Sequence, residues 1–372
     1  MKTEKIKNII LICAMSLLLL SLSLGLAFLP KEDFSTSERR TLAKMPEVSL
    51  DSFLRGKFVS GFEDYTLDHF PMRDGFRTLK AINENFVFAK MDNGGFYLSD
   101  GYISKLEYPL DEEMIKYAAD KFVAVKDKYL SESGGNVYMS VVPDKNMFLA
   151  EKSGHLSLDY DRLTKILRSG TDGQGIEYID IYPLLDAGDY YRTDTHWRQE
   201  KITDVADKLL SEMGAERTGA KYTERELDTP FYGVYYGQAA IPVRPDRIKY
   251  LESDIFSDCT VEVLGAKGDG VNNIYNMEKA VGKDPYEMFL SGAQAIITIE
   301  NPHFDGEKKL VVFRDSFGSS LAPLLIEGYS KITLVDIRYI DSSLIGSYVD
   351  FENTDALFIY STIMLNTAKI LK

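Results

Sequence analysis

The chain has 372 residues, of which 45% are hydrophobic, 12% aromatic and 27% charged. This composition is typical of a folded globular protein and excludes general disorder. The formal net charge of -14 argues against a nucleic-acid partner, because nucleic-acid grooves depend on basic residues that neutralise phosphates. With two cysteines and four histidines, neither a disulfide scaffold nor a cysteine-rich zinc site is expected, and we predict no metal and no cofactor.

The N-terminus has the pattern of a membrane anchor. Three lysines within the first seven residues precede a nearly unbroken apolar run from Ile9 to Leu29. As a helix this run is roughly 30 Å long, the thickness of a bilayer core. A secretory signal peptide has a shorter apolar run and a small-x-small cleavage site. We therefore predict an uncleaved single-pass anchor over residues 1–30, with a cytoplasmic N-terminus and an extracytoplasmic remainder. A cleaved signal peptide is the alternative.

Residues 31–95 show few strand signals and predict a helical arm. Aromatic and aliphatic residues recur at mixed helical spacing between Phe58 and Phe86, and Pro71 interrupts them. The adjacent pair Asp68 and His69 is interpreted as a helix end or packing feature, because it lies beside this proline.

Residues 96–372 alternate short apolar strands with amphipathic helices, which predicts a three-layer α/β/α domain with a mainly parallel sheet. The predicted strands include 137–142, 176–181, 309–313, 332–337 and 356–360, and the predicted helices include 111–130, 160–167, 202–213 and 321–326. Residues 217–308 break this rhythm with many Tyr, Gly and Asp residues. We interpret them as a β-rich insert, with alternating runs such as 231–236.

Two short segments carry candidate catalytic chemistry. In the first, Asp194 and His196 are two positions apart, so in an extended segment both side chains point to the same side. A carboxylate beside an imidazole orients the ring and stabilises its charged form, as a hydrolase base requires. A structural hydrogen bond or a helix cap would explain the same spacing.

In the second segment, a buried strand ends at Phe313 and runs into Arg314, Asp315 and Ser316. Ser316 would lie at the carboxyl end of its strand, where open α/β sheets bind their ligands. The N–H groups of the following residues Phe317 and Gly318 are candidate oxyanion donors. A plain N-cap at Asp315 or Ser316 fits the local pattern equally well. Together the two segments provide a nucleophile, a base and an orienting acid, in a chain order that triads do not forbid.

These segments resemble the DHHW family and the related O-acetylation proteins of alginate biosynthesis, which have SGNH-hydrolase-like domains. The resemblance rests on Asp194-Thr195-His196-Trp197 and Phe313-Arg314-Asp315-Ser316-Phe317, and extends to Glu38-Arg39-Arg40, 68–74, 284–290 and 336–339. It implies an SGNH-like domain in which Ser316 is the nucleophile, His196 the base and Asp194 the orienting acid. The Gly-x-Asn-Asp block of many SGNH enzymes is missing, and Asn366 is the candidate substitute.

Further residues are candidates for lining the cleft: Trp197, Arg314, Lys145, Arg192 and Arg338. Arginines near strand ends would give a locally basic cleft within an acidic protein. His303 with Asp305 lacks a third ligand nearby and is interpreted as an ordinary loop.

The resemblance and the predicted N-terminal anchor together imply a membrane-anchored acyltransferase or esterase that acts on O-acetyl groups of a cell-surface polysaccharide. Its expected partners are a glycan and a membrane O-acyltransferase that donates the acyl group. The alternative is a non-catalytic envelope protein that keeps the fold for binding or scaffolding.

Overall fold

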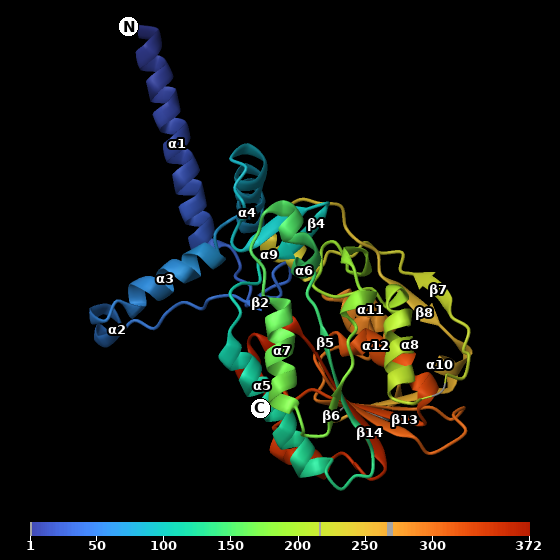
Figure 1. The fold of residues 1–372 in the computed structure, drawn as a ribbon. Coiled ribbons are helices and arrows are strands. Elements are labelled where there is room, and N and C mark those ends of the chain that lie inside the picture. Colours follow the sequence, from blue (N-terminus) through green and yellow to red (C-terminus); the bar gives the residue numbers. More distant parts are fainter. Residues whose placement is uncertain (1, 216, 266–270) are drawn as a thin grey trace. The chain divides into compact units, whose positions relative to one another are not determined.

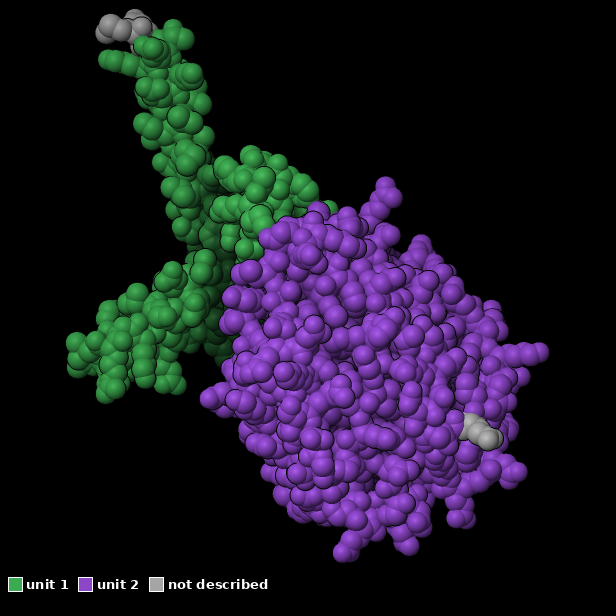
Figure 2. All heavy atoms as spheres, in the orientation of Figure 1, with its two compact units in different colours: residues 1–94, 234–242 green, residues 95–233, 243–372 purple. Residues whose placement is uncertain are grey.

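The computed structural model describes residues 2–215, 217–265 and 271–372 (Figure 1). Its residues form two units, coloured separately in Figure 2. Unit 1 comprises residues 1–94 and 234–242, and unit 2 comprises residues 95–233 and 243–372. The chain therefore leaves unit 2 after Gly233 and returns to it at Val243.

Unit 1 begins with one continuous helix, α1 (Lys2–Phe28). Residues Thr3–Phe28 of this helix are long and apolar enough to cross a membrane, and none of their most apolar stretch is buried against protein. The helix thus extends the predicted apolar run by seven residues toward the N-terminus, into the lysine-containing segment.

The rest of unit 1 is largely helical. It contains a short hairpin, three α-helices and a π-turn: β1 (Phe34–Ser35), β2 (Arg40–Thr41), α2 (Leu50–Leu54), α3 (Lys57–Asp68), α4 (Arg73–Ile82) and η1 (Asn83–Val87). The helical pattern breaks around Pro71, where Met72 takes a left-handed backbone conformation at the start of α4. Around this break, Asp68 pairs with Arg40 and Glu38 pairs with Arg73, which joins the hairpin to the helices.

Unit 1 also includes helix α9 (Val234–Ala239), and here the sequence interpretation was wrong. The alternating run 231–236 suggested a strand. Gly237 packs so closely on the N-terminal segment that an added Cβ would lie 1.6 Å from the carbonyl oxygen of Ser37. This long-range packing favours the helix, and the local alternation could not reveal it.

The core of unit 2 is a single eight-stranded sheet. Its strand order is β10 (Val271–Asn272), β9 (Thr260–Val263), β11 (Ile296–Glu300), β13 (Lys331–Val335), β12 (Lys309–Arg314), β14 (Thr354–Ser361), β5 (Val137–Val142) and β6 (Ile176–Tyr178). The five strands from β13 to β6 are parallel, and β11, β9 and β10 continue the sheet in antiparallel pairs. The mainly parallel sheet is therefore confirmed.

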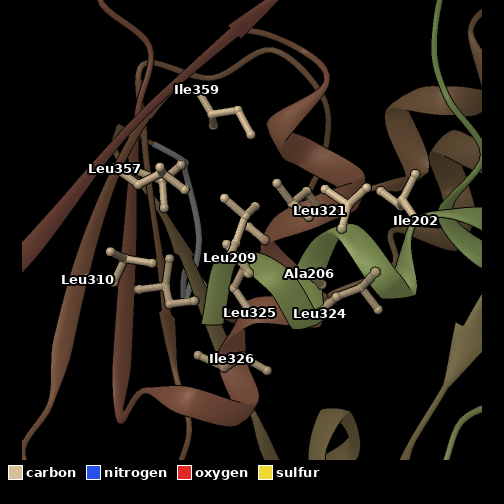
Figure 3. Packing of buried hydrophobic residues seen from close by; sticks show 14 of the residues in the cluster. Ile202, Ala206, Leu209, Leu310, Leu321, Leu324, Leu325, Ile326, Leu357 and Ile359 are labelled. Atoms are coloured by element: carbon tan, nitrogen blue, oxygen red, sulfur yellow. The ribbon is translucent and has the colours of Figure 1, made fainter. Parts of the chain in front are cut away.

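Helices cover both faces of this sheet. Alternate strand residues point to opposite sides, and because the residues on both sides are apolar, each face packs against helices. Val311 and Phe313 pack toward α5 (Glu112–Tyr129) and α7 (Tyr160–Thr171). Leu310 and Val312 pack toward α8 (Thr203–Glu212) and α12 (Gly318–Leu325). Figure 3 shows side chains of α8, α12, β12 and β14 directed toward one another in this second layer. The predicted three-layer architecture is thus confirmed.

Residues 217–308, predicted as a β-rich insert, combine short strands with about as many residues in short helical segments among the described residues, and they do not stand apart from the sheet. Strands β9, β10 and β11 lie in this stretch and complete one edge of the central sheet. The earlier part forms a separate hairpin of β7 (Thr223–Glu226) and β8 (Lys249–Glu252). The strand pattern at 96–105 is a hairpin of β3 (Phe96–Ser99) and β4 (Tyr102–Lys105).

Shorter helical segments connect these elements. The short α-helices of unit 2 are α6 (Asn146–Leu149), α10 (Asp254–Asp258), α11 (Met277–Ala280) and α13 (Thr362–Leu365). The 3₁₀ turns are η2 (Glu151–Ser153), η3 (Tyr182–Leu184), η4 (Ala187–Asp189), η5 (Gln199–Lys201), η6 (Pro285–Met288), η7 (Ile326–Gly328), η8 (Ser342–Ser347) and η9 (Ala368–Ile370).

Candidate active site

Ser316 lies in the tight turn between strand β12 and helix α12. The carboxylate of Asp315 accepts the N–H of Phe317 at 3.0 Å and, from the neighbouring strand end, the N–H of Ser361 at 2.8 Å. Asp315 therefore shapes the turn and ties it to β14. Ser316 is half-buried between the buried residues Asp315 and Phe317, so its hydroxyl faces outward from the turn. The capping interpretation thus applies to Asp315 and leaves the side chain of Ser316 for another partner.

That partner is His196. The Nε2 atom of His196 lies 2.7 Å from the Oγ atom of Ser316. On the other side of the ring, Nδ1 lies 2.5 Å from Oδ1 of Asp194, and the same oxygen accepts the backbone N–H of His196 at 3.1 Å. The sheet therefore brings together three residues that the sequence separates into two distant segments.

The hydrogen-bond chemistry of this chain fixes the direction of each bond. An ionised carboxylate can only accept, so Nδ1 of His196 carries the proton that faces Asp194. In the neutral ring Nε2 then has a free lone pair, which accepts the hydroxyl proton of Ser316. Asp194 is fully buried, so its carboxylate is held in one position and fixes the ring.

Trp197 supports this arrangement from inside the protein rather than lining a cleft. Its side chain is fully buried, and its indole N–H donates to the carbonyl oxygen of Phe317 at 3.1 Å and to the hydroxyl of Ser320 at 3.0 Å. Its ring also meets the ring of Phe317 edge to face, with centroids 5.4 Å apart. Trp197 thus joins the loop of His196 to the turn of Ser316.

Tyr286 also contacts the imidazole, and the sequence interpretation gave it no role. Its ring stacks on the ring of His196 with centroids 3.9 Å apart and an angle of 8° between the planes. Its hydroxyl lies 2.9 Å from Oγ of Ser320. Burial raises the pKa of Tyr286, which keeps the phenol protonated. The signal available in the sequence was the segment 284–290, which contributes to the family resemblance.

Lys145 lies beneath the loop that carries Asp194. Its ammonium group donates to the backbone carbonyl oxygens of Tyr191 at 2.9 Å, Arg192 at 3.2 Å and Asp194 at 2.6 Å. The side chain is buried, so the prediction that it lines the cleft was wrong. Burial lowers the pKa of Lys145 to about 7. Lys145 is a positioning residue for the loop, because three backbone carbonyl groups of the loop converge on its ammonium group.

Two further residues hold the same loop, and the sequence interpretation missed both. The carboxylate of Asp246 accepts the N–H groups of Arg192 and Thr193, at 3.1 and 2.7 Å, and the Thr193 hydroxyl at 2.6 Å. Gly233 lies directly against the backbone of Asp194, where an added Cβ would lie 2.4 Å from the Asp194 Cβ. No local pattern marks either residue, because each acts on a segment distant in sequence.

The three arginines do not form the basic cleft that we predicted. Arg314 is fully buried and lies 3.8 Å from the carboxylate of Asp336. Arg338 donates two hydrogen bonds to the same carboxylate, at 2.8 and 2.6 Å. Arg192 is exposed, and its guanidinium lies over the ring of Tyr102, with 5.8 Å to the centroid. Arg314 and Arg338 thus share the buried carboxylate of Asp336, which compensates part of their positive charge.

The predicted oxyanion donors are engaged within the turn. The N–H of Phe317 donates to the side chain of Asp315, and the N–H of Gly318 donates to the backbone carbonyl of Asp315 at 3.2 Å. Among the described residues, no hydrogen-bond partner is found for the N–H of Ser316 itself, so this group remains as a donor. Asn366 lies elsewhere, because its side chain accepts from the N–H of Asp111 and donates to the carbonyl of Pro109.

The remaining histidine motifs have structural partners. Nε2 of His69 lies 2.9 Å from the carbonyl oxygen of Ala43, and Asp68 pairs with Arg40. His303 is exposed and lies 2.6 Å from the carboxylate of Asp258, not Asp305. Within residues 2–215, 217–265 and 271–372, no cluster of three or more His, Cys, Asp or Glu side chains could hold a metal ion.

Two protein-family models match segments of this chain that contain candidate site residues. The model described as DHHW protein matches residues 178–335, a range that contains Asp194, His196 and Ser316. The model described as SGNH hydrolase-like domain, acetyltransferase AlgX, matches residues 102–245. The resemblance to these two families is therefore confirmed. Comparison with curated protein sequences finds no match.

Solved structures with a similar fold include two bacterial proteins. A DHHW family protein from Eubacterium siraeum is 22% identical, with a TM-score of 0.58, over 75% of this chain and 95% of that chain. PatB1 of Bacillus cereus is 17% identical, with a TM-score of 0.58, over 73% of this chain and 96% of that chain. PatB1 with a sulfonyl adduct aligns with a TM-score of 0.57. At these identities the similarity establishes the fold.

Proposed function

We propose that this chain, which resembles DHHW proteins and the AlgX acetyltransferase domain, is a membrane-anchored O-acetyltransferase or acetylesterase. The observation that carries the proposal is the continuous chain of hydrogen bonds from Ser316 through His196 to Asp194, at 2.7 and 2.5 Å. Such a chain activates a serine hydroxyl, which is otherwise a weak nucleophile at neutral pH.

In the proposed reaction Ser316 Oγ attacks the carbonyl carbon of an acetyl ester while Nε2 of His196 takes the hydroxyl proton. The charged imidazole is stabilised by Asp194, whose carboxylate faces Nδ1. Collapse of the tetrahedral intermediate breaks the bond to the leaving alcohol, which receives the proton from Nε2. An acceptor hydroxyl, or water, then attacks the acetyl carbonyl carbon, with His196 again as the base. The bond between this carbon and Ser316 Oγ breaks, and Oγ takes the proton back from Nε2.

The stabilisation of the tetrahedral oxyanion is the least complete part of the site. The N–H of Ser316 can serve as one donor, because the turn leaves it without a partner among the described residues. The N–H groups of Phe317 and Gly318 would have to exchange their bonds to Asp315 to contribute. Removing one oxyanion donor costs about 10²–10³ in rate in a well-studied hydrolase. We therefore expect a modest rate with small esters in the absence of the natural acceptor.

The substrate class follows from the family resemblance and the anchor. The AlgX domain is described as an acetyltransferase, which supports an acetyl group and a hydroxyl acceptor. We propose a cell-surface glycan as the acceptor and a membrane O-acyltransferase as the source of the acetyl group. The net charge of -14 disfavours a strongly anionic glycan through the long-range field. Helix α1 would hold the catalytic unit at the extracytoplasmic face.

An ester assay with the full-length protein tests the proposal. The protein in detergent micelles is incubated with p-nitrophenyl acetate, and nitrophenol release is compared between wild type and Ser316→Ala. Release by wild type and its loss in the variant are expected. Ser343→Ala, in an exposed 3₁₀ turn, is a matched control that should keep the wild-type rate.

A sulfonyl fluoride provides a second readout that does not depend on turnover. PatB1 has been solved with a sulfonyl adduct, which makes this reagent class a suitable probe. Wild type should gain one sulfonyl group on the peptide that contains Ser316, and His196→Ala should not. Equal rates for wild type and Ser316→Ala, without labelling, would favour a non-catalytic envelope protein.

A further inference from the structure

Helices α2 and α3 bury none of their side chains, although both carry large apolar residues. The rings of Phe53 and Phe58 stack with centroids 4.9 Å apart, and those of Phe58 and Phe62 with centroids 6.0 Å apart. Tyr65 extends this row by one helical turn. We call Phe53, Phe58, Phe62 and Tyr65 the aromatic stripe. An aromatic row in water is unfavourable, so a stripe of this length needs a cover.

The opposite face of α3 is mainly polar. Lys57, Ser60 and Asp64 lie there at helical spacing, with the exposed Leu67 as the apolar exception beside Ser60, and the helix is therefore amphipathic. Between residues 50 and 68 there are four acidic and two basic side chains: Asp51, Glu63, Asp64 and Asp68, and Arg55 and Lys57. Because this segment has a net negative charge, electrostatic attraction to an anionic partner cannot be the main force that holds α2 and α3 against it. The apolar face has to provide the binding free energy.

The stripe is joined to the end of the membrane-spanning candidate. Gly25, in the last turn of α1, lies so close to Pro71 that an added Cβ would be 2.8 Å from the Cγ atom of Pro71. Helix α3 ends at Asp68, three positions before this proline. At about 1.5 Å per residue, the twelve residues of α3 reach roughly 18 Å from that point. If α1 spans a bilayer, the C-terminal end of α3 lies close to the point where the chain leaves it.

We infer that α2 and α3 lie in the headgroup region of the extracytoplasmic leaflet, with the aromatic stripe inserted toward the acyl chains. This inference rests on the membrane anchoring proposed above. Aromatic rings suit the boundary between headgroups and acyl chains, and amphipathic helices bind there through buried apolar area. The exposed side chains of Leu50 and Leu54 enlarge the apolar area on α2. The arm is then a second membrane contact beside α1.

Fluorescence quenching in lipid vesicles tests this placement with the full-length chain. The single native tryptophan, Trp197, is buried in unit 2 and supplies a constant background. Tryptophan is introduced by Phe62→Trp in the stripe and by Ser60→Trp on the polar face, as the matched control. Leu18→Trp in α1 reports membrane insertion itself. Each variant is placed in phosphatidylcholine vesicles with and without lipids brominated in the upper part of their acyl chains.

For each variant the measured quantity is the fraction of the added tryptophan emission that the brominated lipids quench. For Phe62→Trp we expect this fraction to be at least half of the fraction for Leu18→Trp. For Ser60→Trp we expect a much smaller fraction. The quenching should persist in high salt, because salt screens charges and leaves apolar insertion intact. Phe53→Trp should repeat the result and guards against misfolding of a single variant.

Quenching of Leu18→Trp without quenching at positions 53 and 62 would overturn the inference and leave the anchoring intact. A blue-shifted but unquenched emission at position 62 would instead indicate that a second copy covers the stripe, which also contradicts it. Absence of quenching at all three positions would overturn the anchoring and the inference together.

Discussion

The indole N–H of Trp197 donates to the carbonyl oxygen of Phe317 at 3.1 Å. Each of these residues directly follows a member of the candidate triad, His196 and Ser316 respectively. The bond therefore fixes two segments that lie far apart in sequence at the point where the reaction would occur. Positioning within a fraction of an ångström matters here, because a misplacement of about 1 Å can cost roughly 10²-fold in rate.

The first prediction concerns this link. Trp197→Phe removes both indole hydrogen bonds and part of a fully buried side chain. We expect a loss of about 2–4 kcal/mol in the free energy of unfolding, from the cavity and the lost hydrogen bonds to the carbonyl of Phe317 and the hydroxyl of Ser320. The ester rate should fall as well, although His196 and Ser316 are unchanged. Guanidinium unfolding and the ester assay measure the two effects.

Tyr286→Phe is the matched comparison for this variant. It removes the hydroxyl contact to Ser320 at 2.9 Å and keeps the ring stacked on His196. Its stability cost should be about 0.5–1.5 kcal/mol, as for one hydrogen bond. If Trp197→Phe were no more costly than Tyr286→Phe, the link between the two loops would not matter for stability.

The second prediction separates the effect of the negative charge of Asp194 from the effect of its side-chain shape. Asp194→Asn keeps the side-chain volume and removes the charge that faces Nδ1 of His196. The amide no longer stabilises the charged imidazole, so the rate should fall by about 10²–10⁴-fold. Labelling of Ser316 by a sulfonyl fluoride should slow in parallel. A wild-type rate in Asp194→Asn would remove Asp194 from the mechanism.

The third prediction is a pH dependence of stability caused by Lys145. Burial lowers the pKa of Lys145 to about 7, from 10.5 in the unfolded chain. Between these values the unfolded state binds more protons than the folded state, so stability gains about 1.4 kcal/mol per pH unit as the pH rises. Below about pH 7 the side chain is charged in both states and this gain is absent.

Lys145→Met removes this group while keeping an unbranched side chain. The stability of wild type minus that of Lys145→Met should therefore rise from about pH 7 toward pH 10, measured by denaturant unfolding at several pH values. A difference that stays flat over this range would show that the three carbonyl contacts keep Lys145 fully charged in the folded protein.

The fourth prediction concerns the close contact between Gly233 and Asp194. In Gly233→Ala the new Cβ would lie 2.4 Å from the Cβ of Asp194, so the loop has to move. We expect the rate to fall by about 10²-fold or more while the protein stays folded. Gly75→Ala in α4 is the control, because no atom lies within 4 Å of its added Cβ. Equal activity in both variants would show that the loop tolerates displacement.

The central fold could be predicted because its signals are local. Strands such as 309–313 and 356–360 are continuous apolar runs, and the helix predicted at 111–130 is α5 (Glu112–Tyr129). The strand predicted at 295–299 is β11, whereas the helix α9 and the strands β9 and β10 were not predicted. Their structure depends on partners distant in the chain, as the contact of Gly237 with Ser37 illustrates.

The residues of the candidate site also divide into those with a local sequence signal, which could be predicted, and those whose position depends on distant partners. Asp194, His196 and Ser316 were selected because their residue types and strand-end positions suit one chemistry, and the structure places them within hydrogen-bond distance. Arg314 and Lys145 were misplaced, since charged residues at strand ends usually face solvent. Here Asp336 and three loop carbonyls provide buried partners that no local pattern announces.

The most direct test of the proposed mechanism is detection of an acetyl group on Ser316. The full-length protein is mixed with p-nitrophenyl acetate, quenched in acid within the first turnover, digested and analysed by mass spectrometry. The account predicts one acetyl group on the peptide that contains Ser316, in wild type but in neither Ser316→Ala nor His196→Ala. Acetylation that spares Ser316 in wild type, together with undiminished ester cleavage by Ser316→Ala, would contradict it.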